Sequence, residues 1–175
     1  MSGRALSNMS AFILMGVSGA GKSTIGKRVA AELALPFIEG DDYHPQQNVA
    51  KMSAGIPLTD ADRWPWIDAL VRAVNERREP DLVIGCSALS NAVRSRLRAG
   101  IARPVHFVFL TAPREVIEER LAKRPRHYMK PGMLGSQFEA LEAPDDAVEI
   151  DVNRPLEDTT DEVTAYVREH LGQPS

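Results

Sequence analysis

The sequence has little of several features that would assign it to particular classes of protein. It contains one cysteine among 175 residues, Cys86, so it forms no internal disulfide and no cysteine metal cluster. No apolar run approaches the ~20 residues that a transmembrane helix needs. The net charge of −3 provides no general basic surface for nucleic acid. We therefore expect a globular protein of the reducing cytoplasm, with no membrane and no nucleic acid as partner.

What the chain does contain is a phosphate-binding loop. Residues 16–23 read GVSGAGKS and fit the pattern GxxxxGK(S/T). An apolar run over 11–15 predicts a buried strand before the loop, and the apolar spacing after it predicts a helix. Loop N–H groups and a helix N-terminus together favour a bound polyphosphate. The residues expected to contact the nucleotide are Gly16, Ser18, Gly19, Ala20, Gly21, Lys22, Ser23 and Thr24.

Two side chains of this loop have predicted roles of their own. Lys22 is expected to reach the β- and γ-phosphates of ATP and to act in catalysis, and Ser23 to supply a hydroxyl to Mg²⁺. The alternative interpretation is a glycine-rich turn that only joins a strand to a helix. The strand pattern before the loop and the helix pattern after it favour nucleotide binding.

The rest of the chain alternates strand and helix patterns. Further strands are predicted over 35–39, 82–86, 105–110 and 147–152, with helices between them. This order predicts one α/β domain with a five-stranded parallel sheet and helices on both faces, resembling nucleoside-monophosphate and shikimate kinases. Residues 1–10 are expected to be a flexible leader, 11–175 the domain, and about 122–134 a lid.

Polar segments follow the predicted strands, where open α/β sheets place ligands. The turn GDDYHP over 40–45 is either a site or a solvated loop, and Arg63 at a helix mouth is available to an anion. The same helix is expected to begin with a capping box over 59–62 and to place Trp66 in the core. The basic stretch KRPRHYMKP over 123–131 is interpreted as a lid, with an exposed turn as the alternative. Three arginines of another predicted helix are expected to be solvated, namely Arg94, Arg96 and Arg98.

Together these segments resemble the gluconate kinases of the phosphate-loop class. The similarity runs from about Phe12 to Leu156 and includes MGVSGAGKST at 15–24, CSAL at 86–89 and RPRHYMK through SQFEALEAP at 124–144. Its most specific part is GDDYHPQQNVAKMSAGIPLTDADRWPW at 40–66. The resemblance implies ATP- and Mg²⁺-dependent phosphorylation of D-gluconate to 6-phosphogluconate by a cytoplasmic protein, with a homodimer common in the family.

The resemblance also implies roles for single residues. Asp41 is expected to orient, and to deprotonate, the 6-hydroxyl of gluconate, and Arg63 to bind its carboxylate. Arg124 is expected to neutralise charge on the γ-phosphate from the lid. Arg120 and Arg154 are expected at the nucleotide. The remaining expected substrate contacts are His44, Lys51, His127, Lys130 and Gln137.

One departure concerns the metal. Glu39 stands where this family often has an aspartate that helps to hold Mg²⁺, and the third strand ends in Cys86-Ser87 without a carboxylate. The metal ligands expected from the sequence are therefore Ser23 and Glu39, with the phosphates and waters completing the shell.

Two other functions remain open at this point. One is another small-molecule kinase of the same fold, such as a shikimate kinase, although the Gly-Gly pair that shikimate kinases carry after the third strand is missing here. The other is a regulatory GTPase, which would need the motifs NKxD and DxxG, and neither is found in the chain.

Overall fold

The computed structural model describes residues 8–124 and 132–173, and within them the predicted parallel sheet is confirmed. Its strand order is β2–β3–β1–β4–β5, and each neighbouring pair is parallel. The strands are β1 (Ser10–Met15), β2 (Phe37–Glu39), β3 (Asp81–Gly85), β4 (Val105–Thr111) and β5 (Val148–Asp151). β1 begins at Ser10, the last residue assigned to the leader, and this residue is fully buried.

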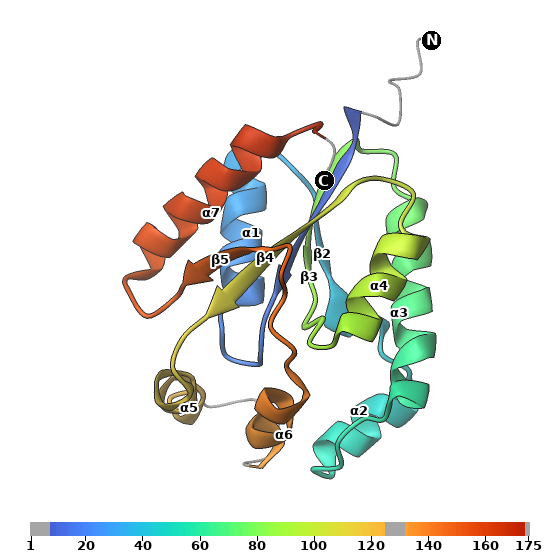
Figure 1. Cartoon of the computed structure of the whole chain (residues 1–175), viewed down its shortest axis with the longest axis vertical. Coiled ribbons are helices and arrows are strands. Elements are labelled where there is room, and N and C mark those ends of the chain that lie inside the picture. The colour runs from blue at the N-terminus through green and yellow to red at the C-terminus, as the bar shows by residue number, and fades with distance from the viewer. Residues whose placement is uncertain (1–7, 125–131, 174–175) are drawn as a thin grey trace.

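Helices cover both faces of the sheet, as Figure 1 shows. On one face lie α1 (Lys22–Leu33) and α7 (Leu156–His170), and on the other α3 (Asp60–Asn75) and α4 (Asn91–Gly100). Beyond one end of the sheet lie α2 (Gln46–Ser53), α5 (Arg114–Ala122) and α6 (Met133–Ala140). A short 3₁₀ turn, η2 (Gly40–Tyr43), follows β2.

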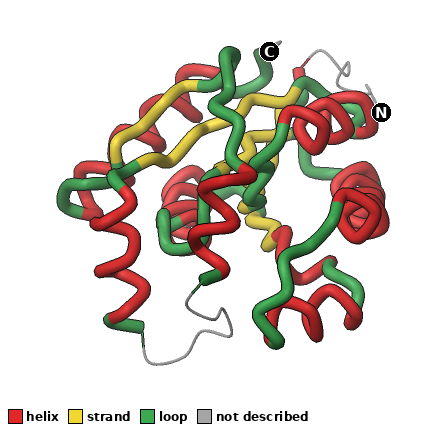
Figure 2. The backbone as a smooth tube through the Cα atoms, turned by 60° about the horizontal axis from the view of Figure 1, so that its bottom comes forward, coloured by secondary structure: helices red, strands yellow, loops and turns green. Residues whose placement is uncertain are grey.

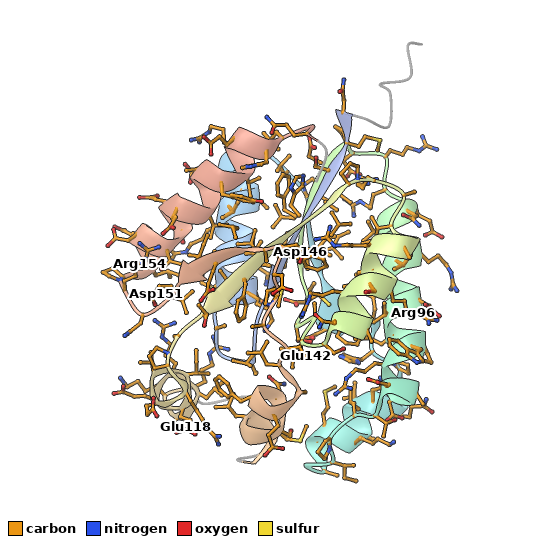
Figure 3. All side chains as sticks on the ribbon, viewed as in Figure 1. Arg96, Glu118, Glu142, Asp146, Asp151 and Arg154 are labelled. Carbon is orange, nitrogen blue, oxygen red and sulfur yellow. The ribbon has the colours of Figure 1, made fainter. Side chains whose placement is uncertain are left out.

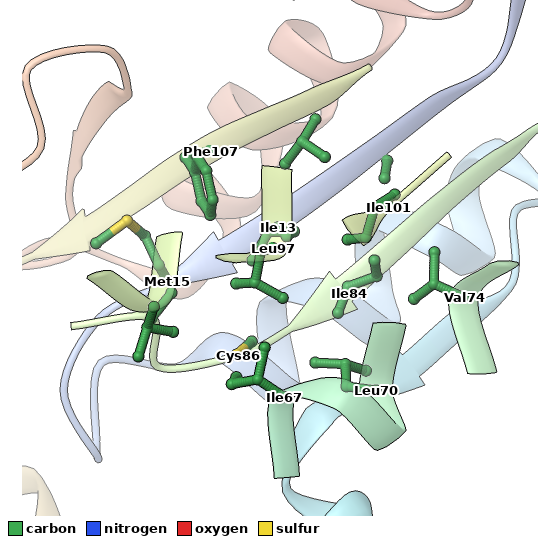
Figure 4. Packing of buried hydrophobic residues seen from close by; sticks show 14 of the residues in the cluster. Ile13, Met15, Ile67, Leu70, Val74, Ile84, Cys86, Leu97, Ile101 and Phe107 are labelled. Atoms are coloured by element: carbon green, nitrogen blue, oxygen red, sulfur yellow. The ribbon is translucent and has the colours of Figure 1, made fainter. Parts of the chain in front are cut away.

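The two faces of β1 account for the two halves of the core. Ala11, Ile13 and Met15 point toward α3 and α4, while Phe12 and Leu14 point toward α1 and α7. All five side chains are fully buried, as expected for a strand with neighbours on both faces. Figure 4 shows the first of these clusters, in which strand and helix side chains interdigitate.

The carboxyl ends of the strands form the edge of the sheet where a ligand would bind. β1 lies between β3 and β4, so the chain proceeds to one side of β1 through β2 and β3 and then crosses to the other side at β4. Crevices of α/β sheets form where the strand order reverses in this way. The phosphate loop follows β1 and therefore lies at this point.

A close approach of two backbones fixes the loop after β2. A Cβ atom on Gly40 would lie 2.4 Å from the Gly85 carbonyl oxygen, so only glycine fits there. The Gly40 carbonyl oxygen accepts a buried hydrogen bond of 2.8 Å from the Trp66 indole N–H. This bond joins η2 to α3, and Trp66 is part of the core as the sequence predicted.

The α4 arginines differ from the sequence prediction in one respect. Arg94 is only 4% exposed, so the prediction that it is solvated was wrong. Arg96 is exposed and pairs with Asp68, and Arg98 pairs with Asp146. Helical periodicity places Arg94 beside the apolar residues that face the sheet.

Among the described residues, no helix combines the length and the apolar character required to cross a bilayer.

We predict that Trp66→Phe lowers stability more than Trp64→Phe does. The first substitution leaves the buried Gly40 carbonyl without its donor, which costs about 1–3 kcal/mol. Thermal melting should show this as a loss of roughly 2–4 °C in Tm per kcal/mol. Trp64 is half-buried against the Arg96 guanidinium and is the matched control. Equal losses in the two variants would contradict the assigned role of the indole hydrogen bond.

Candidate active site

The phosphate loop turns sharply as it leaves β1. Gly16 has φ +147°, and a Cβ atom there would lie 2.7 Å from the Leu110 carbonyl oxygen. The Gly16 N–H donates to the Ser87 carbonyl oxygen, 3.2 Å away, in the loop after β3. α1 begins at Lys22, so its N-terminus and the loop N–H groups belong to one continuous turn.

Lys22 is folded back onto the loop. Its ammonium donates to the carbonyl oxygens of Gly16, at 2.9 Å, and Val17, at 3.0 Å. Burial lowers the pKa of Lys22, and the negative charges of Asp41 and Glu39 oppose that effect. The charge of Asp41 therefore acts directly on the lysine predicted to bind the phosphates.

The predicted metal ligands lie next to each other. The Ser23 hydroxyl donates a hydrogen bond to the Glu39 carboxylate, so the longer side chain of glutamate reaches the phosphate loop from β2. A hydroxyl and a carboxylate are hard oxygen ligands that fit Mg²⁺. No group of three or more histidine, cysteine, aspartate or glutamate side chains suited to a metal occurs in the described ranges. Such a site would need phosphate oxygens to complete it.

A cavity of about 260 Å³ opens beside the phosphate loop. It lies between α1, α5 and the segment that joins β5 to α7, and three arginines predicted to act on the nucleotide line it together with loop residues. The residues around it are Gly19, Ala20, Gly21, Thr24, Ile25, Arg120, Arg124, Val152, Arg154, Leu156 and Thr159.

Two of these arginines are held in place by backbone carbonyl groups near the end of β5. Arg120 donates to the Val152 carbonyl oxygen. Arg154 donates through Nε to the Asp151 carbonyl oxygen, 2.9 Å away, and also pairs with Glu162. Figure 3 shows Arg154 beside Asp151 at this edge. The positive charge at the cavity is thus fixed by the fold.

The loop after β2 places Asp41 and His44 close together. The Asp41 carboxylate is 48% exposed and lies 3.9 Å from His44 Nε2. The His44 side chain is 5% exposed and stacks on Trp66, with ring centroids 4.0 Å apart. Burial lowers the pKa of His44 to about 4, although the Asp41 charge acts in the opposite direction. His44 is therefore neutral at pH 7.

Asn48 is a residue of this region for which no role was predicted. It is fully buried, and its amide nitrogen donates to the Asp62 carbonyl oxygen at 2.9 Å. The same nitrogen lies 3.2 Å from His44 Nδ1, which must then be the acceptor. The proton of the neutral ring is accordingly on Nε2, facing Asp41. An asparagine four residues after the histidine was the available sequence signal.

Lys51, a predicted substrate contact, forms an ion pair within the protein. Its ammonium contacts both oxygens of Asp62, at 3.0 and 2.9 Å. Asp62 also closes the predicted capping box with Thr59 at the start of α3, which is confirmed. The hydrogen bonds from Lys51 and Thr59 lower the pKa of Asp62 to about 2. Lys51 thus joins α2 to α3, and its contact with substrate stays a prediction.

A second cavity, of about 70 Å³, lies between α2, α3, α6 and the loop after β3. It brings together Arg63 and Gln137, which are both predicted substrate residues and lie far apart in sequence. The lining residues are Met52, Pro57, Leu58, Arg63, Trp66, Ser87, Leu89, Met133, Ser136, Gln137 and Ala140.

Both predicted residues already have partners in this cavity. Arg63 pairs with Asp60 at 3.0 Å. The Gln137 side-chain oxygen accepts a hydrogen bond of 2.7 Å from the Ser18 N–H. Sequence reasoning missed this bond, which connects α6 directly to the phosphate loop. The second cavity and the cavity of about 260 Å³, from here on called the nucleotide cavity, are therefore both connected to the phosphate loop.

The predicted lid is only partly within the described structure. α5 ends at Ala122 and α6 begins at Met133, in agreement with a connecting segment between them. Figure 2 shows both helices on the same side of the sheet. Arg124 is exposed and lines the nucleotide cavity. His127 and Lys130 lie outside the described residues.

Comparison with known proteins supplies the family. The sequence model of a family described as an AAA domain matches residues 12–144. The thermosensitive gluconokinase of Escherichia coli K12 is 45% identical over 158 residues, which cover 86% of this chain and 83% of that protein. The chain belongs to the gluconokinase family. The thermoresistant gluconokinase of the same organism is 41% identical over 152 residues.

Solved structures agree with this assignment. The crystal structure of a gluconokinase from Sinorhizobium meliloti 1021 has a TM-score of 0.84 and 40% identity, covering 94% of each chain. Shikimate kinase from Aquifex aeolicus, at 17% identity and a TM-score of 0.56, shares the fold alone. The predicted kinase fold is thus confirmed.

We predict that His44 makes stability depend on pH. His44 is neutral in the folded protein and has an ordinary pKa of 6.5 when unfolded, so the unfolded state binds more protons between pH 6.5 and about 4. Its contribution is fully present above pH 6.5 and is lost as the pH falls toward 4, by up to about 3 kcal/mol. Urea unfolding of the wild type and His44→Phe at pH 7, 6, 5 and 4.5 measures this difference. A constant difference across that range would contradict the prediction.

Proposed function

We propose that the protein transfers the γ-phosphoryl group of ATP to the 6-hydroxyl of D-gluconate, giving 6-phospho-D-gluconate and ADP. The observation that carries the proposal is the Gln137–Ser18 hydrogen bond, because it joins the second cavity, which Arg63 and Gln137 line, to the phosphate loop of the nucleotide cavity. Direct phosphoryl transfer needs donor and acceptor sites that meet at the γ-phosphate. Relatives named gluconokinase over most of the chain support the identity of the acceptor.

On the donor side, the residues present suit a nucleoside triphosphate. The loop N–H groups and the N-terminus of α1 would hold the β-phosphate, with Lys22 released from its carbonyl partners onto the β- and γ-phosphates. Arg120 and Arg154 would lie along the nucleotide in its cavity. An acidic protein thereby concentrates positive charge where the phosphates bind.

For Mg²⁺, the Ser23 hydroxyl is the proposed protein ligand, and Glu39 is proposed to orient that hydroxyl and a water molecule of the ion. When bound, the ion would neutralise part of the phosphate charge.

On the acceptor side, we assign the gluconate carboxylate to Arg63, which faces the second cavity. Asp41 is assigned to the 6-hydroxyl, which it would orient and deprotonate. Its charge influences Lys22, and this supports a position close to the transferred group. His44, Lys51 and Gln137 are assigned to substrate hydroxyls, each after rearrangement of its present partner.

The lid would add positive charge from the segment that follows α5. Arg124 would neutralise the γ-phosphate as the lid closes, and His127 and Lys130 would contact the acceptor from the same segment. Closure would exclude water, which otherwise competes with gluconate for the phosphoryl group. A homodimer and a cytoplasmic location belong to the same proposal and rest on the family resemblance.

The test of the function is a coupled assay with ATP and a panel of sugar acids, shikimate and nucleoside monophosphates. We expect ADP production to depend on D-gluconate and the product to carry phosphate on its 6-oxygen. Equal ADP production with and without gluconate would overturn the proposal. Turnover of another acceptor in the panel would favour a different small-molecule kinase of this fold.

We predict that Asp41→Asn lowers kcat for gluconate about 10²–10⁴-fold, the range typical of a lost general base. Affinity for an ATP analogue, measured by calorimetry, should stay within about 3-fold, because the loop N–H groups and the arginines are unchanged. Asp42→Asn, at the exposed neighbouring position, is the matched control. An unchanged kcat in Asp41→Asn would remove Asp41 from the mechanism.

A further inference from the structure

Arg94 is a buried cation for which the activity described above provides no role. It is 4% exposed on α4, whereas Arg96, two residues later on the same helix, is exposed. The guanidinium donates to backbone and amide oxygens on three segments of chain. Burial lowers the pKa of Arg94, yet the guanidinium keeps its positive charge at pH 7. A buried charge that donates hydrogen bonds to several segments indicates that the side chain holds those segments in position.

One half of the guanidinium holds the loop after β3. Nη1 donates to the carbonyl oxygen of Ala88 at 2.6 Å and to that of Leu89 at 3.0 Å. Ala88 is buried and has φ +45°, a left-handed conformation that costs a non-glycine residue on the order of 1–3 kcal/mol. Such a conformation persists only when its surroundings enforce it. The two hydrogen bonds from Arg94 provide that enforcement.

The other half connects this loop to the segment after α6. Nη2 donates to the Asn91 side-chain oxygen at 2.5 Å and to the Glu142 carbonyl oxygen at 2.6 Å. The Glu142 N–H donates in turn to the Leu89 carbonyl oxygen at 2.8 Å. Figure 3 places Glu142 inward of α4 and Arg96 at its outer side. Arg94 therefore fixes the end of α6 against the loop after β3.

These two segments form one wall of the second cavity. Ser87 and Leu89 line it from the loop after β3, and Ser136, Gln137 and Ala140 line it from α6. None of the residues that line the nucleotide cavity comes from either segment. A change at Arg94 should consequently act most strongly on the acceptor side, because the two segments reach the phosphate loop only through the Gln137–Ser18 and Ser87–Gly16 hydrogen bonds described above.

We propose that Arg94 is a positioning residue for the acceptor site, because its guanidinium holds the loop after β3 and the segment after α6 together in one wall of the second cavity. The proposal rests on the proposed gluconate kinase function and adds to it a residue that touches neither substrate. Arginine suits the task because its planar fork serves four acceptors at once, whereas a lysine ammonium has three donors at a single point.

The test compares Arg94→Lys and Arg94→Met with the control Arg96→Met. For Arg94→Lys we expect KM for gluconate to rise at least about 10-fold, the effect of roughly 1.4 kcal/mol. Kd for the ATP analogue AMPPNP should stay within about 3-fold, and Arg94→Met should show a larger rise in KM with the same split. Arg96→Met should change neither quantity, because its ion pair with Asp68 is exposed.

A second readout needs no turnover. Hydrogen exchange at the Glu142 amide, which donates to the Leu89 carbonyl oxygen, should accelerate at least about 10-fold in Arg94→Lys, while amides of α1 are unchanged. Failure of the wild type to phosphorylate gluconate would overturn the proposed function, and the exchange experiment would still decide the role of Arg94. Equal losses for gluconate and AMPPNP, or unchanged exchange at the Glu142 amide, would overturn the role of Arg94.

Discussion

The hydrogen bond from the Gly16 N–H to the Ser87 carbonyl oxygen is the contact on which the site depends. It holds the first residue of the phosphate loop against the loop after β3. The segments that follow β1 and β3 are therefore connected directly. The phosphate loop lines the nucleotide cavity through Gly19, Ala20 and Gly21, and the loop after β3 lines the second cavity through Ser87 and Leu89. Phosphoryl transfer depends mainly on positioning and charge, and one backbone contact therefore aligns both halves.

Charge placement follows from the same junction. The chain is acidic overall, yet it places the half-buried Lys22 and the buried Arg94 near the ends of β1 and β3. Each satisfies its donors with carbonyl oxygens, which carry no charge that would compete with a phosphate. The carboxylates of Glu39 and Asp41 follow at the end of β2, and their charges oppose the effect of burial on the pKa of Lys22.

The sequence was sufficient for the sheet, the phosphate loop and the capping box, because each depends on periodicity or on residues close together in the chain. It was not sufficient for Arg94, since a helix pattern cannot tell a solvated arginine from one that finds carbonyl acceptors on distant segments. The same reason applies to Lys51, whose partner Asp62 lies across a turn. Asn48 lies in the segment over 40–66 that carries the family resemblance, but its hydrogen bond to the His44 ring is seen only in the folded structure.

The hydrogen bonds around the phosphate loop also affect how much free energy is gained when a phosphate binds there. The Ser18 N–H is paired with Gln137, Lys22 with two carbonyl oxygens, and Ser23 with Glu39. A phosphate that takes these donors replaces existing bonds, so the net gain is the difference between the two partners. Charged phosphate oxygens are stronger acceptors than amides or carbonyls, and the difference favours exchange. The Gln137 side chain lines the second cavity. If a phosphate replaced it as the acceptor at the Ser18 N–H, the Gln137 amide would become available to a molecule in that cavity.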